Sequence, residues 1–466
     1  MHAPWTAASH DPLLGRISDL FTPDDYLVGG CVRDFCLGVP PADFDIVTFG
    51  DVWRLAGMIA ERLGSQAFWM DKTRAIARIA VGSPAVKIDV CAPKAAPIAA
   101  DLAQRDITIN AMALHPATQA LLDPLQGLMD LESRIIRMIS EQNLVDDPLR
   151  VLRCLRFAVQ LDFSPSPETG FAVKRHAARI TAVAPERIKQ ELCAALALAG
   201  GAEIFELIYD YGLPLFPQYV DIDQGPHHRW PLIRHAVLAA LEAEKLLDRA
   251  ETYLPGIGKY FAEQIEDGVP RASILKLAAF LHDIGKPEAH TLGDDGAVHF
   301  YGHARVGAAL ITRTLKHMRF ATQTIHIAAG IVEHHMRVLE LAVGGVITNR
   351  AMHRFLKASQ GFTPELLLLT IADAEATGKD PAYTGARPDI EAIVKRIWEY
   401  DRQVFSVTSL SPLLNGHDIM QALDIPPGPH VGEALALVEE ARADGLVNDR
   451  NEALAYLRNM RASEFP

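Results

Sequence analysis

The hydrophobic pattern of this sequence changes near residue 140, and that change limits the folds open to the chain. Before about residue 115, short apolar runs such as DYLVGG, DFDIVTFG and VKIDVCA alternate with helical stretches. This alternation predicts a mixed α/β domain. Later segments, such as DPLRVLRCLRFAVQL and SILKLAAFLHDIG, repeat their apolar residues at the helical period. We therefore expect an α/β head, with a mixed sheet and helices, followed by all-α domains.

The length of 466 residues predicts several domains, because a single hydrophobic core rarely grows to that size. Breaks rich in proline and glycine near residues 213–217 and 380–388 mark candidate boundaries. We place the head at 1–139, a helical neck at 140–215, a histidine-bearing helical domain at 216–385 and a C-terminal helical region at 386–466.

Composition and charge limit the cellular compartments and the binding partners that we expect for the protein. The five cysteines are scattered and form no CxxC pair, which is typical of a reducing compartment. The first residues lack the features of a secretory signal, and the apolar runs are too short to span a bilayer, so we expect a cytoplasmic protein without membrane contact. The net charge of −13 argues against general nucleic-acid coating, but residues 150–189 hold eight basic against three acidic side chains. That segment is either an RNA-binding face or a solvated helix surface.

Three aspartates of the head suggest a metal site. Asp43 and Asp45 flank one phenylalanine in a strand-like segment, where side chains i and i+2 share a face. Asp89 lies within another strand-like segment, and Gly29–Gly30 separates a strand from a helix upstream. Three neighbouring carboxylates repel one another unless cations neutralise them, and oxygen ligands suit Mg²⁺. The pattern favours a Mg²⁺ site over an ordinary strand edge, with a glycine turn open to an anionic ligand.

Arginines of the neck suggest nucleotide binding. Arg150, Arg153 and Arg156 follow one another at three-residue steps, which places them on one side of a predicted helix. Asp147 precedes Arg150 by three residues, and we expect it on the same face. A carboxylate acceptor and a guanidinium donor so spaced can meet the edge of a base, while the other arginines bind phosphates. The alternative is an amphipathic helix with internal ion pairs.

Histidines and aspartates gather on the later helical segments. The set consists of His235, His282, Asp283, His303, His335 and Asp373. This combination exceeds what core packing requires, since an aspartate in an apolar run needs a partner. Imidazole and carboxylate ligands together suit a divalent metal ion.

The segments LVGGCVRD, ADFDIV and RDITINA resemble the head of the class II tRNA nucleotidyltransferase/poly(A) polymerase family, and VDDPLR resembles its base-reading segment. The resemblance implies that Asp43 and Asp45 bind Mg²⁺ and act in catalysis with Asp89. The implied nucleotide-binding residues are Gly29, Gly30, Arg33, Arg105, Asp106, Asn110, Asp147, Arg150, Arg153 and Arg156. Asp147 and Arg150 match the two family positions whose side chains select CTP and ATP, and the resemblance implies the same role for them. Gln104 and Asp146 depart from the family pattern, which has arginine and glutamate there.

The order His…His-Asp…Asp resembles the HD phosphohydrolase superfamily. It implies His235, His282, Asp283 and Asp373 as ligands of a divalent metal, and His303 and His335 could widen the site to two metals. The metal and the substrate of this site stay open. Head, neck, HD domain and tail in this order resemble bacterial tRNA nucleotidyltransferases, which implies that the C-terminal region binds tRNA.

Only fifteen residues separate Asp89 from Arg105. Family members that build the whole CCA end usually have a longer, arginine-rich loop there, and its loss marks members that add only two cytidines. The resemblance therefore implies transfer of cytidine from CTP to the tRNA 3′ end, with addition of the final adenosine from ATP left open. A CC-adding chain would need a separate A-adding enzyme afterwards. Further alternatives are a poly(A) polymerase of the same family, a phosphohydrolase with an inactive head and a non-catalytic tRNA-binding protein. The sequence does not decide whether the chain forms a homodimer.

Overall fold

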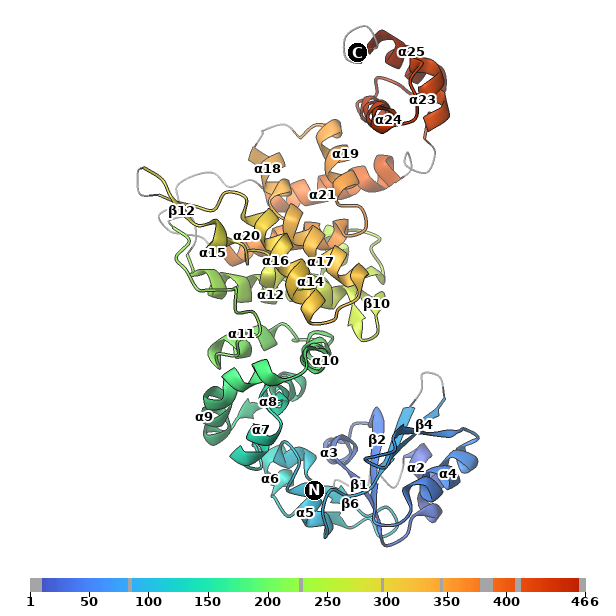
Figure 1. Cartoon of the computed structure of the whole chain (residues 1–466), viewed down its shortest axis with the longest axis vertical. Coiled ribbons are helices and arrows are strands. Elements are labelled where there is room, and N and C mark those ends of the chain that lie inside the picture. The colour runs from blue at the N-terminus through green and yellow to red at the C-terminus, as the bar shows by residue number, and fades with distance from the viewer. Residues whose placement is uncertain are drawn as a thin grey trace. The chain divides into compact units, whose positions relative to one another are not determined.

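The computed structural model describes residues 11–82, 86–225, 229–294, 297–343, 347–377, 389–406 and 412–460. The chain divides into two compact units, one formed by residues 1–195 with 207–215 and the other by residues 196–206 with 216–466. In Figure 1, the strands of the head are blue, and the helices that follow run from cyan through yellow to red. The predicted domain boundary at residue 385 lies outside the described residues.

The head contains a seven-stranded sheet with the order β3-β4-β5-β2-β1-β6-β7. The strands are β1 (Asp25–Val28), β2 (Asp43–Thr48), β3 (Ala67–Asp71), β4 (Ile76–Val81), β5 (Val86–Cys91), β6 (Ala113–Leu114) and β7 (Leu121–Leu122). Neighbouring strands are antiparallel except β2 and β5, which pair in parallel. The expectation of a mixed α/β head followed by helical domains is confirmed.

Helices cover one face of this sheet, and the carboxylates lie on the other. Phe44 of β2 is buried and packs against Phe35 of helix α3 (Gly30–Leu37), with ring centroids 6.2 Å apart. Helix α4 (Val52–Leu63) packs on β4 and β5. Because side chains alternate along a strand, Asp43 and Asp45 lie on the face opposite Phe44. The helices therefore support the sheet from behind the predicted metal site.

A proline divides the first helices of the neck. Helix α7 (Glu141–Asp146) ends just before Asp147, and helix α8 (Leu149–Leu161) begins just after Pro148. A residue that precedes proline is disfavoured in the helical region, and Asp147 has extended φ and ψ of −136° and 94°. The expectation that Asp147 lies on the helix face of Arg150 is therefore wrong. Helices α9 (Pro167–His176) and α10 (Pro185–Leu196) complete the neck.

The second unit is built around helix α20 (Thr363–Thr377). Its leucines at Leu366–Leu369 are all fully buried, as expected for a helix that is apolar on every side. Helices α12 (Leu232–Asp248), α14 (Arg271–Leu281) and α17 (Thr322–His334) pack against α20, and α16 (His303–His317) packs against α17. These helices and their ends carry the histidines and aspartates singled out in the sequence.

A separate small core holds the C-terminal helices together. Helices α23 (Gly416–Leu423), α24 (Pro429–Ala443) and α25 (Arg450–Met460) enclose the buried side chains of Ile419, Val438 and Leu457. Shorter elements include α2 (Pro12–Ile17), α5 (Ile98–Leu102), α6 (Gly127–Glu132), α11 (Glu203–Asp210), α15 (Lys286–Ala289), α18 (Arg337–Val343), α19 (Asn349–Ala358) and α21 (Ile390–Tyr400). In the part of the chain that the structure describes, no helix is both long and apolar enough to cross a membrane.

Candidate functional site

The three head aspartates lie on two neighbouring strands. Asp45 of β2 and Asp89 of β5 are register partners, and Asp43 is two residues before Asp45 on the same face. Burial raises the pKa of Asp45, and the charges of Asp89 and Asp43 add to this rise against the lowering effect of Arg105. Crowded carboxylates of this kind favour a bound cation, since a cation removes their mutual repulsion. The oxygen donors fit the ligand preference of Mg²⁺.

Arg78 is a residue of this site that the sequence patterns did not reveal. It lies on β4 opposite Asp89, and its guanidinium donates to both carboxylate oxygens, at 2.7 and 2.8 Å. Strand alternation could have put Arg78 on the polar face of the sheet, but only the register of β4 and β5 brings it to Asp89. Asp89 is thus neutralised by a neighbouring strand in this structure.

The glycine turn lies directly beside the carboxylates. Gly29 has a φ of +78°, a conformation that favours glycine, and it immediately precedes helix α3. A methyl group on Gly29 would lie 3.2 Å from an oxygen of Asp45 and 3.0 Å from a nitrogen of Arg105. Glycine therefore keeps open a space between a carboxylate, a guanidinium and a helix N-terminus, which suits an anionic ligand near a cation.

A chain of buried polar side chains connects helix α3 to the neck. Arg33 donates to Asn110 at 2.9 Å, and the Asn110 amide lies 3.5 Å from Asp106. Arg153 binds the other oxygen of Asp106 at 2.7 and 2.9 Å. Burial alone would raise the pKa of Asp106, but the charge and hydrogen bonds of Arg153 lower it overall. Four of the implied nucleotide-binding residues therefore form one connected network.

Glu191 of helix α10 ties two arginines of α8 together. It accepts from Arg153 at 2.8 Å and from Arg156 at 2.5 Å. The guanidinium of Arg156 also lies 3.9 Å from the ring centroid of Phe157. The sequence does not identify Glu191 as a site residue, because its pairing depends on the packing of α10 against α8. These arginines are engaged within the protein and do not form a free basic surface.

Asp147 and Arg150 have different partners in this structure. Both oxygens of Asp147 accept from Arg187 of α10, at 3.2 and 2.8 Å. Arg150 donates to the backbone carbonyls of Gln104, Arg105 and Asn143, at 2.6, 3.2 and 3.2 Å. Arg150 thereby connects the end of helix α7 to the Arg-Asp segment of the head. Arg187 is the third residue of the site, after Arg78 and Glu191, that the sequence patterns did not identify.

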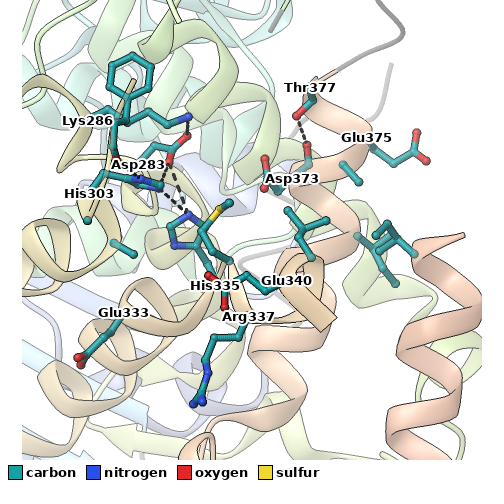
Figure 2. Close-up of a pocket in the computed structure, with 18 of the residues that line it drawn as sticks. Asp283, Lys286, His303, Glu333, His335, Arg337, Glu340, Asp373, Glu375 and Thr377 are labelled. Atoms are coloured by element: carbon teal, nitrogen blue, oxygen red, sulfur yellow. Dashed lines mark hydrogen bonds and ion pairs between the residues drawn. The ribbon is translucent and has the colours of Figure 1, made fainter. Parts of the chain in front are cut away.

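The histidines and aspartates of the second unit converge on Asp283. One oxygen of Asp283 lies 3.1 Å from His282 and 3.7 Å from His235, and the other lies 3.2 Å from His303 and 3.6 Å from His335. Asp373 of α20 completes the first group, at 3.1 Å from His235 and 3.6 Å from His282. Figure 2 shows Asp283, His303 and His335 directed toward one another, with Asp373 on a neighbouring helix.

Three of these histidines are oriented by the backbone. The Nδ1 atoms of His282, His303 and His335 each lie 2.7–2.9 Å from the carbonyl oxygen three residues earlier. A proton on Nδ1 leaves Nε2 as the free ligand atom, which is how second partners fix metal-binding histidines. The Nε2 atoms of His303 and His335 approach to 3.2 Å, as do those of His235 and His282. Ring nitrogens so directed suit two metal positions that share the Asp283 carboxylate.

The charge of this centre supports the same assignment. Burial opposes ionisation of Asp283, yet His282 and Lys286 hold the pKa of its carboxyl well below the usual range. Lys286 lies 2.6 Å from Asp283 and donates to the buried Gln224 at 2.7 Å. Lys286 follows Asp283 by three residues in HDIGK, and this i,i+3 spacing could have predicted that the lysine pairs with the aspartate. Asp283 is therefore ionised, which is the form in which a carboxylate binds a divalent metal.

A cavity of about 1190 Å³ opens beside the centre. Its wall includes Asp283 and Asp373, the basic side chains Arg229 and Arg337, and the aromatic Tyr301. Part of this lining is drawn in Figure 2. Acidic side chains such as Glu333, Glu340 and Glu375 share this wall, so a phosphate-bearing ligand would need bound metal ions together with Arg229 and Arg337.

Four family descriptions match successive parts of the sequence. They are the Poly A polymerase head domain at residues 25–137, the probable RNA and SrmB-binding site of polymerase A at 162–221, the HD domain at 256–378, and tRNA nucleotidyltransferase domain 2 at 382–457. His235 lies outside the HD match, and only the fold brings it to the centre. These matches describe a family of metal-dependent nucleotidyltransferases that carry an HD domain.

Relatives cover nearly the whole chain. The A-adding tRNA nucleotidyltransferase of Deinococcus radiodurans is 34% identical and spans 96% of this chain and 97% of its own length. The CC-adding tRNA nucleotidyltransferase of Thermus thermophilus is 30% identical and spans 94% of both chains. A CCA-adding enzyme in an apo form shares the fold with a TM-score of 0.68 at 19% identity, over 97% of this chain and 94% of its own. The Thermotoga maritima CCA-adding enzyme complexed with tRNA has a TM-score of 0.64 at 19% identity, over 97% of each chain. This chain therefore belongs to the tRNA nucleotidyltransferase family of enzymes.

Proposed function

We propose that the chain transfers nucleotides from CTP, ATP or both to the 3′ end of tRNA without a nucleic-acid template. The observation that carries this proposal is the placement of Asp43, Asp45 and Asp89 on paired strands, directly beside Gly29 and Arg105. In this reaction the 3′ hydroxyl of the RNA attacks the α-phosphate of the bound nucleotide, and pyrophosphate leaves. Mg²⁺ held by Asp43 and Asp45 would lower the pKa of the hydroxyl and stabilise the leaving group.

The chain supplies binding and orientation around this reaction. Gly29 and the N-terminus of α3 leave room for the triphosphate, and Arg105 lies at the same opening. Asp147 and Arg150 are the proposed base-reading pair. Arg187 holds Asp147 in this structure, but their side chains are 49% and 30% exposed, so a base can replace this pair at small cost.

The connection between Asp89 and Arg105 supports addition of cytidine only. Its fifteen residues include the short helix α5. Asp101 of this helix accepts a hydrogen bond from the backbone N–H of Lys94, at 2.7 Å. Asp101 also lies 3.5 Å from Arg105, so the connection is anchored at both ends. A separate A-adding enzyme would then complete the CCA end. The similarity to the Deinococcus radiodurans relative, whose name states A addition, favours A addition as the second candidate.

The deciding experiment offers the protein three tRNAs, ending at the discriminator base, at the first C or at the second C, with labelled CTP or ATP. Labelling of the first two by CTP alone supports a CC-adding enzyme, whereas labelling of only the third by ATP supports an A-adding enzyme. Addition of all three nucleotides indicates a complete CCA-adding enzyme. Long A tails on unrelated RNAs would identify a poly(A) polymerase, and no labelling at all would overturn the proposal.

We further propose that the HD centre binds divalent metal ions and hydrolyses a phosphate ester. The two ligand groups around Asp283 and the cavity with its basic side chains support this proposal. The test is to measure the metal content of the purified protein and phosphate release from cyclic and terminal nucleotide phosphates. Absence of bound metal after loading with Mn²⁺, Mg²⁺, Zn²⁺ or Ni²⁺ would refute it.

The C-terminal region at 386–466 is the proposed tRNA-binding part.

A further inference from the structure

We propose that Phe68 and Met70 of strand β3 form a stacking platform for the terminal base of the RNA that the enzyme extends. The proposal rests on the proposed nucleotide transfer to RNA, and it assigns a place to the substrate strand as distinct from the incoming nucleotide. It depends on the register of the sheet, on the exposure of two apolar side chains and on the charges around them.

The register of four strands puts Phe68 in line with the catalytic carboxylates. Phe68 of β3 is paired with Arg78 of β4, Arg78 with Asp89 of β5, and Asp89 with Asp45 of β2. Paired residues of neighbouring strands project on the same side of a sheet. Phe68 therefore belongs to the face that carries the metal site, opposite the face covered by α3 and α4.

The exposed side chains of β3 are not part of the hydrophobic core. Phe68 and Met70 are 46% and 50% exposed, and they alternate with Trp69, which stacks on Trp53 of α4 at 4.8 Å. Trp69 thus anchors the strand to the helix layer, and Phe68 projects to the other side. Met70 is exposed at the irregularity in the register between Trp69 and Asp71. Among the strands that the structure describes, β3 is the outermost of the sheet on this side. The strand presents an aromatic ring and a flexible thioether to a ligand at the active-site face.

The charges around the platform complement an RNA backbone. Lys72 and Arg74 are exposed in the turn between β3 and β4, and Lys87 is exposed on β5. Arg78 lies between the platform and Asp89, and in this structure its guanidinium forms an ion pair with the Asp89 carboxylate. Cations beside an aromatic surface are the combination by which proteins hold single-stranded nucleic acid. Lys72, Lys87 and Arg74, whose guanidinium lies 3.7 Å from Asp71, favour a polyanionic ligand over an uncharged apolar partner.

The spacing agrees with the size of the ligand. Two strand intervals separate Phe68 from Asp89, which amounts to about 10 Å across the sheet. That distance is comparable with one nucleotide, so a base stacked on Phe68 can direct its ribose toward the carboxylates. Stacking tolerates any base, because every base has a π face. A platform of this kind suits a substrate whose last base differs between tRNAs and changes after each addition.

The experiment compares three variants of the full-length protein. Phe68→Ala removes the ring, Phe68→Tyr retains it, and Met58→Ala removes an exposed apolar side chain from α4, behind the sheet. KM values for tRNA and for the nucleotide are measured separately. Binding of a tRNA whose last base is 2-aminopurine is followed by fluorescence without nucleotide, where stacking quenches the signal.

We expect Phe68→Ala to raise KM for tRNA by about tenfold or more, to remove the quenching and to leave KM for the nucleotide unchanged. Phe68→Tyr and Met58→Ala should behave like the unaltered protein. Unchanged quenching and KM in Phe68→Ala would overturn the proposal, as would an equal rise in both KM values. If circular dichroism shows that Phe68→Ala is unfolded, Met70→Ala takes its place, with a smaller effect in the same direction.

The outcomes separate the two proposals. If the unaltered protein adds nucleotides and Phe68→Ala does so with the same KM for tRNA, the platform is refuted and the transfer activity stands. If the unaltered protein binds and quenches the tRNA but transfers nothing, the proposed activity fails while the fluorescence comparison still decides the platform. Absence of tRNA binding by the unaltered protein refutes both.

Discussion

Arg187 binds both carboxylate oxygens of Asp147, although forty residues separate them in the sequence. The pair joins helix α10 to the extended residue between α7 and α8. Arg150, which the spacing had paired with Asp147, instead binds three backbone carbonyls. The base-reading function proposed for Asp147 therefore requires that a nucleotide competes with Arg187, and this competition leads to the first prediction.

Replacement of Asp147 should weaken nucleotide selection more than it weakens folding. Asp147→Ala removes a carboxylate acceptor for a base, so the preference for CTP over UTP in kcat/KM should fall by about tenfold or more. The loss of the exposed pair with Arg187 should cost no more than about 1 kcal/mol of unfolding free energy. The matched control is Asp162→Asn, which weakens an exposed pair between Asp162 of the neck and Arg134 of the head and keeps a residue type that tolerates the positive φ of this position. Equal selectivity in the two variants would contradict the role of Asp147.

Replacement of a head carboxylate should stop nucleotide addition without preventing tRNA binding. Asp45→Asn removes a charged oxygen ligand from the proposed Mg²⁺ site, and we expect kcat to fall by about a thousandfold or more. Labelling assays measure the rate, and a filter-binding titration measures tRNA affinity. Glu61→Gln on the exposed side of α4 is the control. A rate within a few-fold of the unaltered protein would rule out the metal role of Asp45.

The two groups of HD ligands should respond differently to substitution. Asp283 touches both groups, so Asp283→Asn should abolish metal binding at both positions. His303→Ala removes a ligand from one group, and about half of the metal should remain. Mass spectrometry of the metal content tests this after loading and desalting. Nucleotide addition is the internal control and should persist in both variants. Loss of metal to the same extent in both variants would indicate a single metal-binding position.

Arg271 should be necessary for the stability of the second unit. It lies 2.8 Å from the fully buried Glu365, which also accepts from Tyr260 at 2.9 Å. Arg271→Met leaves this carboxylate without its charge partner, and we expect a loss of about 3–5 kcal/mol of unfolding free energy. Glu263→Gln alters the more exposed partner of Arg271 and should cost no more than about 1 kcal/mol.

The deficit of Arg271→Met should grow with pH. Burial raises the pKa of Glu365 above its ordinary value of 4.5, and Arg271 opposes this rise. Without Arg271, the folded state favours the protonated acid more strongly, while the unfolded chain ionises near the ordinary pKa. Stability therefore falls as pH rises above that value. Urea unfolding at pH 5 and pH 8 measures the change, and a deficit that shrinks toward pH 8 would contradict this account.

Local sequence predicted the architecture, and it predicted the aspartates and histidines that the structure brings together at the two candidate sites. Alternation predicted strand β2 and the common face of Asp43 and Asp45, since the direction of a strand side chain depends only on its position in the strand. Helical periodicity predicted the mainly helical character of the later domains. The expectation that they are all-α missed two short antiparallel pairs, Gln264–Glu266 with Val269–Pro270 and Thr291–Leu292 with Val298–His299, whose strands are too short to give a periodic pattern. The HDIGK segment and the scattered histidines identified the members of the second centre, because few other arrangements need those residue types together.

Contacts between distant segments required the folded chain. The pairing of Arg78 with Asp89 follows from the register of two strands, and Glu191 reaches Arg153 and Arg156 only when α10 packs on α8. Pro148 separated Asp147 from the helix of Arg150, and the choice of Arg187 as its partner then depended on that packing. In the HD domain, Asp283 faces two ligand groups because the five helices α12, α14, α16, α17 and α20 bring their histidines and Asp373 together there. Residue spacing determines which side chains share one element, whereas the register and packing between elements determine which of them touch.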